Sequence, residues 1–333
     1  MIYPKNSIIL APLSGFTDIP YRNSAWRHGC KFAFTEMIDA SSLAYGSKRT
    51  DIMLKRSPAD KWLGVQLVGC HADRIVKAVE ILNQHEFDLL DFNLGCPAPK
   101  VARKGAGAIL GQDSDKAAQL MALIAQKSKF PVTAKIRIQD EEDPKPTIVL
   151  VKKLIDAGAQ AITIHGRIRR RFYAGQVHYP IIAAVRESCD IQIIGNGNVM
   201  NQLSYHEMHE KSGCDVVMVA RGAMGNPWLF NELNAPATYI PPTVAELLTE
   251  LKLHVLEMVD FYGEELAMKV SRKIILDYLK GRGFNGTLKS QVSFLKTVND
   301  FNDFMQQVAE TLPSERYWTW LKSFPDAERR LQI

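Results

Sequence analysis

One cysteine lies in a sequence context that suits chemistry. Cys96 stands in the run Asn93-Leu94-Gly95-Cys96-Pro97, in a Gly-Cys-Pro turn that directly follows a run of apolar residues. A thiol on such a loop can give or take a proton or act as a nucleophile, whereas a cysteine elsewhere is usually an inert core residue. The inert interpretation fits the other four cysteines, Cys30, Cys70, Cys189 and Cys214. Cys96 is therefore the candidate catalytic residue.

Other polar residues and glycine-containing turns recur at the ends of short apolar runs. They are Ala11-Pro12-Leu13-Ser14-Gly15, Glu36, Gln66, the Cys96 run, Lys135-Ile136-Arg137, His165-Gly166-Arg167, Gly195-Asn196-Gly197-Asn198 and Ala220-Arg221-Gly222. A buried ammonium such as that of Lys135 needs an anion or a polar heterocycle, and the pyrimidine ring of a flavin is a good match. The alternatives are an ion pair of Lys135 with a core carboxylate, and ordinary core roles for Gln66 and His165.

The last two turns have the composition of a phosphate site. In barrels of parallel strands, such sites commonly follow the seventh and eighth strands, where backbone N–H groups face the anion. Gly195, Gly197 and Gly222 allow a close approach of the backbone, and Arg221 adds charge. The alternative is that these glycines only make tight turns.

The elements that position these residues alternate along the chain. Eight apolar runs are predicted strands, at residues 8–11, 32–35, 64–68, 89–93, 132–136, 161–165, 191–195 and 216–220. Most are apolar at successive positions, which is typical of strands buried on both faces. Helical patterns lie between them, for example at 73–84, 114–127 and 147–157, and Gly158 is placed to end the last. This order predicts a (β/α)₈ TIM barrel, and a doubly wound sheet is the less favoured alternative.

A change of pattern divides the chain. Residues 234–243 are rich in Pro and Thr and read as a linker, with Thr243 placed to cap the next helix. Helical patterns then cover 244–262, 264–280, 286–299 and 301–311. We therefore expect a barrel domain at 1–235 and an all-α helical bundle domain at 243–333.

Composition excludes several classes of protein. The 333 residues carry a net charge of +5, and no stretch approaches the length of a membrane helix. The five cysteines contain no Cys-x-x-Cys pair, so neither a disulfide framework nor a metal site is expected. The start lacks the pattern of a secretory signal, so a cytoplasmic protein is expected, with no membrane partner.

Taken together, these residues resemble the tRNA-dihydrouridine synthases. The matching runs are Leu10–Asp18, Asp91-Phe92-Asn93-Leu94-Gly95-Cys96-Pro97, Lys100-Val101, Arg103–Gly107, Ala134–Arg137, His165-Gly166-Arg167, Gly195-Asn196-Gly197, Ala220–Ala223, Asn226-Pro227-Trp228, Arg272-Lys273 and Tyr278–Gly281. Two positions depart from the family pattern: Ile168 replaces a usual Thr, and Asn198 replaces a common acidic residue. Neither departure touches Cys96 or Lys135.

The resemblance implies a reaction and a set of contacts. It implies reduction of uridines in tRNA to 5,6-dihydrouridine, with FMN as cofactor, NADPH (or NADH) as reductant, hydride transfer to C6 and protonation of C5 by Cys96. A thiol suits this role because its ordinary pKa, about 8.5, leaves it mostly protonated at neutral pH. The implied FMN contacts are Ala11, Pro12, Leu13, Gln66, Lys135, His165, Asn196, Gly197, Asn198, Ala220 and Arg221. Asn93 is implied to hold the target base.

The placement of charge agrees with an RNA substrate. A uridine in folded RNA must leave its stack to reach a flavin, and basic side chains around the barrel mouth would hold the phosphate backbone. The candidates are Lys100, Arg103 and Lys104 after the cysteine, Arg167, Arg169, Arg170 and Arg171 after the sixth strand, and Lys269, Arg272, Lys273 and Lys280 in the tail. The helical bundle at 243–333 is then interpreted as a tRNA-binding domain, and a monomer is expected. The alternatives are a flavin barrel that acts on a free pyrimidine or another small molecule, and an RNA-binding protein with a decayed active site.

Overall fold

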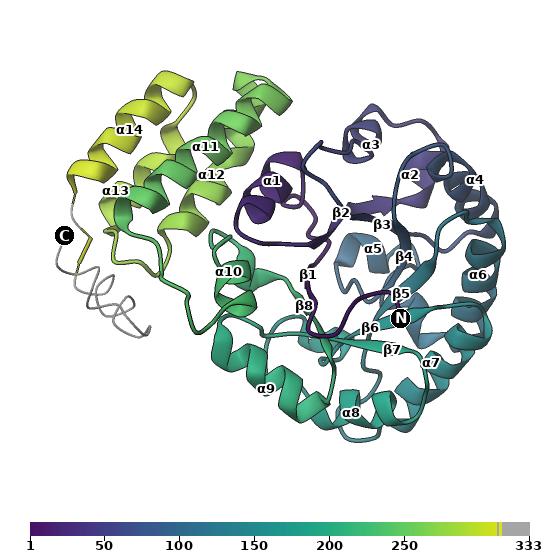
Figure 1. Ribbon diagram of the computed structural model, residues 1–333. Coiled ribbons are helices and arrows are strands. Elements are labelled where there is room, and N and C mark those ends of the chain that lie inside the picture. The colour runs from purple at the N-terminus through teal and green to yellow at the C-terminus, as the bar shows by residue number, and fades with distance from the viewer. Residues whose placement is uncertain (312, 315–333) are drawn as a thin grey trace. The chain divides into compact units, whose positions relative to one another are not determined.

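The eight apolar runs form the strands of a closed barrel in the computed structural model, which describes residues 1–311 and 313–314 (Figure 1). All neighbouring strands are parallel, and β1 pairs with β8, which closes the barrel. The strands are β1 (Ile8–Leu10), β2 (Phe32–Asp39), β3 (Leu63–Val68), β4 (Leu89–Leu94), β5 (Val132–Arg137), β6 (Ala161–His165), β7 (Gln192–Asn196) and β8 (Val216–Val219). The predicted TIM barrel is confirmed, and the closure excludes a doubly wound sheet.

Helices follow the strands of the barrel, and the longer ones cover its outside. They are α2 (Ala40–Ala44), α3 (Lys48–Met53), α4 (Ala72–Leu82), α5 (Pro99–Ala102), α6 (Ser114–Lys127), α7 (Lys145–Asp156), α8 (Tyr179–Glu187) and α9 (Gln202–Ser212), with 3₁₀ turns η1 (Leu110–Gln112) and η2 (Arg169–Arg171). Every residue of β3, β4, β6 and β8 is buried, because side chains on one face fill the barrel and those on the other meet the helices. The helices expected at 73–84, 114–127 and 147–157 correspond to α4, α6 and α7, and both ends of each agree to within two residues. Gly158 lies just beyond the end of α7 and has φ +103°.

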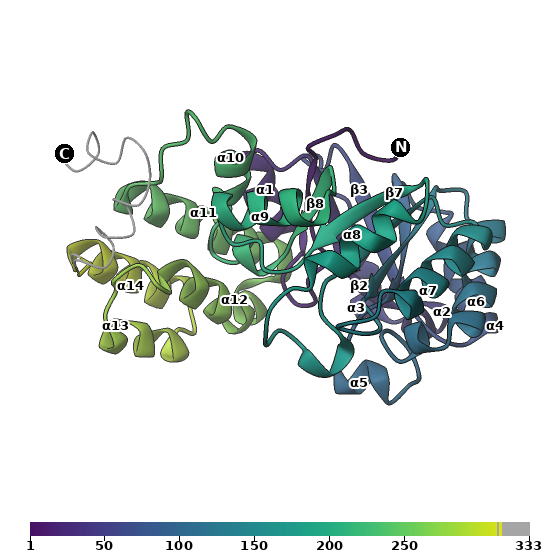
Figure 2. The same ribbon diagram turned by 90° about the horizontal axis from the view of Figure 1, so that it is seen from below.

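The carboxyl ends of the strands define one end of the barrel. The short helix α5, which follows β4, lies on the side away from the N-terminus (Figure 2). Residues that follow different strands therefore meet at this end, as in other parallel barrels.

Contacts divide the chain into two compact units. The first comprises Met1–Asp18 and Lys31–Ala220, and the second comprises Ile19–Cys30 and Arg221–Ile333. The second unit thus includes α1 (Ile19–Arg27), whose partner α11 lies more than two hundred residues further along the chain, a contact that local patterns do not reveal. The bounds 1–235 and 243–333 remain a prediction for domains, and residues 312 and 315–333 lie outside the described part.

Where the structure describes the second unit, up to residue 314 and without residue 312, all of its regular structure is helical. Besides α1 it contains η3 (Arg221–Ala223), α10 (Leu229–Asn234), α11 (Val244–Tyr262), α12 (Glu264–Leu279), α13 (Gly286–Gln291), η4 (Val292–Phe294) and α14 (Val298–Glu310). The expected cap of α11 is confirmed, since Thr243 and Glu246 form a reciprocal capping box. The helix expected at 286–299 is wrong: it ends at η4, because Thr297 caps α14 with its own capping box. In the described residues, no helix has the length and apolarity needed to cross a membrane.

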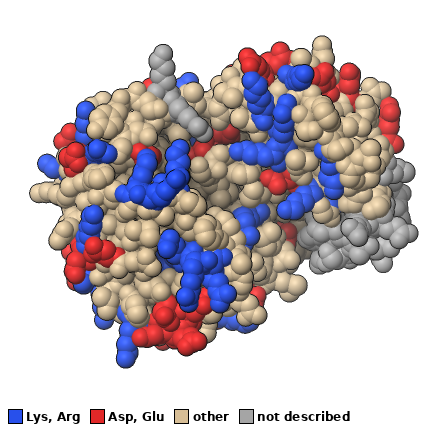
Figure 3. Space-filling model, turned by 180° about the vertical axis from the view of Figure 1, so that it is seen from behind, with Lys and Arg blue, Asp and Glu red and all other residues tan. Residues whose placement is uncertain are grey.

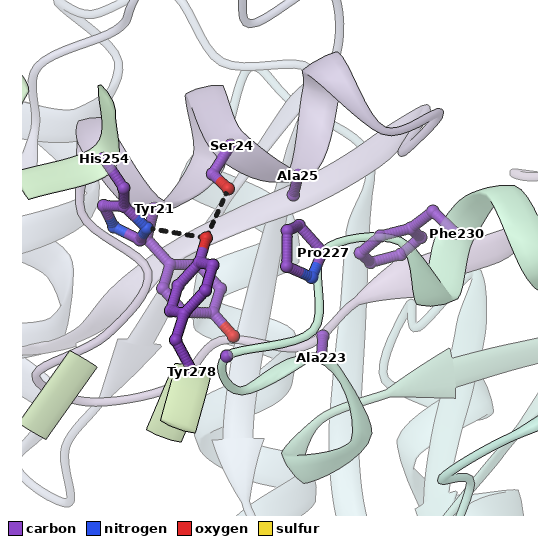
Figure 4. A pocket seen from close by; sticks show the side chains of 9 residues that line it. Tyr21, Ser24, Ala25, Ala223, Pro227, Phe230, His254 and Tyr278 are labelled. Carbon is purple, nitrogen blue, oxygen red and sulfur yellow. Dashed lines mark hydrogen bonds between the residues drawn. The ribbon is translucent and has the colours of Figure 1, made fainter. Parts of the chain in front are cut away.

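A chain of buried hydrogen bonds joins α1, α11 and α12 within this unit. Ser24 Oγ donates to Glu250 Oε1 at 2.7 Å and lies 3.1 Å from Tyr278 Oη, which lies 3.2 Å from His254 Nδ1. Arg27 adds an ion pair to Glu250 at 2.7 Å. Ser24, Tyr278 and His254 line a small pocket of this unit (Figure 4). The chain ties α1 to the C-terminal helices by polar contacts in addition to apolar packing.

We expect acid to destabilise the second unit through His254. Burial, more than any other cause, lowers the pKa of His254 to about 3. Because an unfolded histidine has a pKa of about 6.5, stability is complete above that pH and is lost as pH falls toward 3, by up to about 1.4 kcal/mol per pH unit. Thermal unfolding followed by circular dichroism at pH 7 and pH 5 measures the loss.

The matched variants isolate this histidine. His254→Asn should unfold with a smaller difference between pH 7 and pH 5, whereas His206→Asn, a change on the exposed face of α9, should behave as wild type. Burial raises the pKa of Glu250, but hydrogen bonds from His28, Arg27 and Ser24 outweigh burial and lower it to about 2. The stability that Glu250 contributes is therefore complete above the ~4.3 of an unfolded glutamate and is lost only as pH falls below that value. An unchanged pH dependence in His254→Asn would refute the assignment.

Candidate active site

The Cys96 turn is held by the side chain of Asn93. Asn93 Oδ1 accepts hydrogen bonds from the backbone N–H of Gly95 at 3.1 Å and of Cys96 at 2.9 Å. Asn93 is the penultimate residue of β4 and is 7% exposed, whereas Cys96 is partly exposed. The turn therefore presents the thiol at the mouth while its backbone is fixed from inside the barrel.

Asn93 is itself held by a chain of buried polar side chains. Its Nδ2 donates to Gln66 Oε1 at 2.7 Å, and Gln66 Nε2 donates to Asp91 Oδ2 at 2.8 Å. Thr133 Oγ1 donates to the other oxygen of Asp91 at 2.7 Å. Gln66 is 0% and Asp91 1% exposed, so both ends of the Gln66 amide are used inside the barrel. Gln66, a predicted FMN contact, thus contacts Asn93 and Asp91 in this structure.

Lys135 brings a positive charge to the same end. It lies on β5 opposite Asn93 of β4 and is partly buried. Burial, followed by the charge of Arg137, lowers the pKa of Lys135 to about 8, although Asp91 and Cys96 act in the other direction. Within residues 1–311 and 313–314, no side chain or backbone group makes a hydrogen bond or ion pair with its ammonium. The structure therefore does not contain the ion pair with a core carboxylate that was the alternative for Lys135.

Arg137 connects the Cys96 turn to the loop after β6. Its side chain is 3% exposed, and its Nε donates to Gly95 O at 2.8 Å. Its Nη1 donates to Phe172 O at 2.8 Å, and its guanidinium lies over the ring of Tyr173, 5.8 Å from the centroid. Arg137 thus positions two loops of the mouth, a role that a lone basic residue at a strand end does not reveal.

His165 and Arg167 lie together at the end of β6. His165 is 5% and Arg167 2% exposed, with 3.4 Å between His165 Nε2 and Arg167 Nη1. Arg167 also donates to Gly175 O at 2.7 Å and to Ala174 O at 3.1 Å. The guanidinium of Arg167 is thus buried in its own loop, and a contact of this side chain to RNA stays a prediction.

Packing explains the glycine near the end of β7, Gly195, and the glycine that directly follows the strand, Gly197. A side chain at Gly195 would come within 2.7 Å of Met208 Sδ, and one at Gly197 within 2.8 Å of the His165 ring. Gly197 and Asn198 both have positive φ, at +125° and +59°. Close packing thus requires both glycines whether or not a phosphate binds here.

The remaining predicted cofactor contacts surround β1, β7 and β8. Ala11 N donates to Val219 O at 2.8 Å across the junction of β1 and β8 that closes the barrel, and Asn196 Nδ2 donates to Met218 O at 2.7 Å between β7 and β8. Pro12, Leu13 and Ala220 are partly exposed after their strands. Arg221 belongs to the second unit and follows Ala220 directly in the chain.

Basic side chains gather after β4 and β6, and Figure 3 shows groups of Lys and Arg on one face of the molecule. Lys100 and Arg103 are exposed on and after α5, while Lys104 pairs with Asp39 at 2.9 Å. Arg169 is partly exposed in η2, and Arg171 pairs with Glu141 at 2.9 Å. Lys100, Arg103, Arg169 and the exposed Arg170 therefore offer the positive charge of this rim that ion pairs do not neutralise in the described part.

The basic residues of the tail are engaged to different degrees. Lys269 pairs with Glu265 at 2.6 Å, and Arg272 Nη2 donates to Leu295 O at 2.8 Å. Arg272 and Lys273 are both partly buried on α12. Arg272 thus fixes the segment between η4 and α14 as well as carrying charge.

The other cysteines differ in exposure. Cys30, Cys70 and Cys214 are buried, as expected, but Cys189 is partly exposed at the end of α8, where its Sγ lies 3.3 Å from Val185 O. Burial is the main reason that the pKa values of Cys70 and Cys214 are raised. In the residues that the structure describes, no group of three potential ligands could hold a metal ion.

Fold and site together define a barrel enzyme, with a thiol, a partly buried ammonium and an imidazole at the carboxyl ends of its strands. Residues 9–314 match the family model described as "Dihydrouridine synthase (Dus)". The chain belongs to the dihydrouridine synthase family. Enzymes of this family are flavin-dependent oxidoreductases, and the chain is one of them.

Several known proteins are similar to this chain in sequence or in fold. The chain is 32% identical to tRNA-dihydrouridine synthase B of Pasteurella multocida over 281 residues, which are 83% of this chain and 85% of the relative. It is 33% identical to a probable tRNA-dihydrouridine synthase of Rickettsia conorii over 330 residues, 96% and 97% of the two chains. A solved 6-hydroxypseudooxynicotine amine oxidase from Pseudomonas geniculata matches with a TM-score of 0.53 at 12% identity, covering 69% of this chain and 47% of the oxidase, which shows the fold alone.

Proposed function

We propose that this enzyme reduces specific uridines of tRNA to 5,6-dihydrouridine, with FMN as its flavin and NADPH as the reductant. The observation that carries the proposal is the family match over residues 9–314, which spans both units and includes the Cys96 turn. The relatives named above carry the same activity in their names and are covered over most of their length.

The residues at the mouth fit a flavin. The ammonium of Lys135 has a lowered pKa and no partner in the described part of the chain, so an electron-rich heteroatom would stabilise its charged form. Lys135 and His165 are the proposed contacts to the ring and its side chain, with Ala11, Pro12, Leu13, Asn196, Gly197, Asn198, Ala220 and Arg221 as the further FMN contacts. A bound flavin supplies the hydride that reduces the uracil at C6.

Cys96 is the proposed acid for uracil C5. Its thiol is partly exposed at the mouth, and its backbone is fixed by Asn93, so the proton donor is presented at a defined position. An acid at C5 stabilises the negative charge that develops on the pyrimidine, and no covalent bond to the base is required. Asn93 Nδ2 has one hydrogen beyond its bond to Gln66 with which to hold the base.

The exposed basic residues of the rim are the proposed contacts to the RNA backbone. A macromolecular substrate needs charge outside the pocket, whereas a free pyrimidine does not. We propose Lys100, Arg103 and Arg169 for this role, with Lys269, Arg272 and Lys273 on the second unit.

Removing charge from the rim should weaken RNA binding without changing the chemistry. Lys100→Gln combined with Arg103→Gln should raise the KM for tRNA by roughly 10-fold at about 0.1 M salt and reduce the salt dependence of binding, with kcat close to wild type. Lys116→Gln combined with Lys127→Gln, which removes two charges from α6, is the control. Equal effects of the two double variants would show that only net charge matters.

Purified protein distinguishes the proposal from its alternatives. We expect yellow protein whose released flavin is FMN, and formation of dihydrouridine in unmodified tRNA by mass spectrometry after addition of NADPH. Reduction of free uridine or uracil in preference to tRNA would support the small-molecule alternative. Colourless protein that binds tRNA and does not recover activity with FMN would support a decayed enzyme.

A further inference from the structure

The buried chain from Asp91 to the Cys96 turn has a single consistent direction. Two backbone donors, the N–H groups of Gly95 and Cys96, point at the same atom of the Asn93 amide. That atom must be the oxygen, because it accepts from both. The nitrogen of Asn93 then faces Gln66, which must turn its own oxygen toward Asn93 and its nitrogen toward Asp91. The orientation of each amide follows from these partners.

Asp91 is the end of this chain. It has to accept at one oxygen from Gln66 at 2.8 Å and at the other from Thr133 at 2.7 Å, and an ionised carboxylate does both. Burial raises the pKa of Asp91, and the hydrogen bonds from Gln66 and Thr133 and the charge of Lys135 oppose this effect only in part, so the resulting pKa is about 6. A fully buried carboxylate is costly, so its retention inside the barrel calls for a function beyond apolar packing.

We propose that Asp91 is a positioning residue that, through Gln66 and Asn93, fixes the backbone of the Cys96 turn and thereby the place of the catalytic thiol. Each of the three side chains is at least nine-tenths buried, so water does not compete for their hydrogen bonds. Loss of the acceptor at Asp91 frees the Gln66 amide to turn, and Asn93 can then release the N–H groups of Gly95 and Cys96. The role in catalysis rests on the proposed function, whereas the control of the turn does not.

Three variants separate positioning from simple stability. Asp91→Leu removes the acceptor, and Asp91→Asn keeps one acceptor oxygen for Gln66 and can donate to Thr133. Thr133→Val is the matched control, because it deletes the other buried hydrogen bond to Asp91. That bond is 2.7 Å long, against 2.8 Å for the bond from Gln66, and it is not part of the series of hydrogen bonds that leads to Cys96. If Asp91→Leu does not fold, Gln66→Met takes its place, because it breaks the same series of hydrogen bonds at the middle residue.

The first readout is the reactivity of Cys96 itself. The rate at which iodoacetamide alkylates Cys96, followed for the Cys96 peptide by mass spectrometry, should differ from wild type by about tenfold in Asp91→Leu, which is the scale of one lost buried hydrogen bond. The rate should differ little in Asp91→Asn or Thr133→Val. This measurement does not depend on the substrate. Alkylation of Cys96 at the wild-type rate in folded Asp91→Leu would overturn the proposal.

The second readout is the kinetics of uridine reduction. We expect kcat on tRNA to fall at least about tenfold in Asp91→Leu with KM unchanged, and near wild-type values in Asp91→Asn. A fall in Thr133→Val as large as in Asp91→Leu would assign the effect to stability and overturn the positioning role. Absence of uridine reduction in the wild type, with altered alkylation in Asp91→Leu, would refute the proposed function and leave the control of the turn standing.

Discussion

Replacing Cys96 by alanine is expected to lower kcat for uridine reduction by about 10²–10⁴-fold, the usual contribution of a positioned general acid. The expectation follows from the placement of the thiol: Cys96 is partly exposed, and its turn is fixed by Asn93 and Arg137. Without an acid at C5, negative charge on the pyrimidine stays uncompensated while the C6 position is reduced. Rapid mixing of prereduced enzyme with tRNA measures the step directly.

Two further measurements show that the loss lies in this step. The affinity of Cys96→Ala for tRNA and the rate at which NADPH reduces its flavin should both match wild type, because neither involves the acid. Cys189→Ala is the control, since Cys189 is the other partly exposed cysteine of the described chain. Activity of Cys96→Ala within a few-fold of wild type would remove Cys96 from the mechanism.

Replacing Lys135 by methionine is expected to weaken flavin binding by about 10- to 100-fold, the range for a hydrogen bond from a charged donor. Methionine has a similar length without the charge, and Lys135 makes no other hydrogen bond or ion pair within the described residues. Titration of apoprotein with FMN by fluorescence quenching measures the change. Lys152→Met, a change on the exposed face of α7, is the control.

The stability of the apoprotein provides an independent check on Lys135. Burial and the charge of Arg137 lower its pKa to about 8, below the ~10.4 of an unfolded lysine. The unfolded state therefore binds more protons between these values, so wild-type apoprotein should gain stability as pH rises through this window. Lys135→Met should lack the gain while remaining at least as stable at pH 7. Wild-type flavin affinity in Lys135→Met would contradict the assignment.

Much of the barrel could be predicted because its signals are local. Strands buried on both faces leave continuous apolar runs, and polar residues at their carboxyl ends must converge, so the predicted strand positions agree with β1–β8 to within a few residues. The association of α1 with α11 was not predictable, because it depends on contacts between residues far apart, such as Ser24 with Glu250.

The site shows a similar division. Residue types alone identified Cys96 and Lys135 as candidates, since a thiol on a loop and a lysine at a strand end are unusual. They could not show that Arg167 turns back into its own loop or that Asp91 is linked to Cys96 through two amides. Both depend on the direction of side chains, and the link from Asp91 to Cys96 also requires β3 and β4 to be neighbours.

The most direct test of the central claim is the position-by-position mapping of dihydrouridine in RNA from cells that lack this gene. Complementation with wild type and with Cys96→Ala, expressed to equal levels, completes the experiment. We predict that one or more tRNA uridines lose the modification, that wild type restores it, and that Cys96→Ala does not. An unchanged set of modified uridines in cells without the gene would contradict the RNA substrate, and full restoration by Cys96→Ala would contradict the proposed acid.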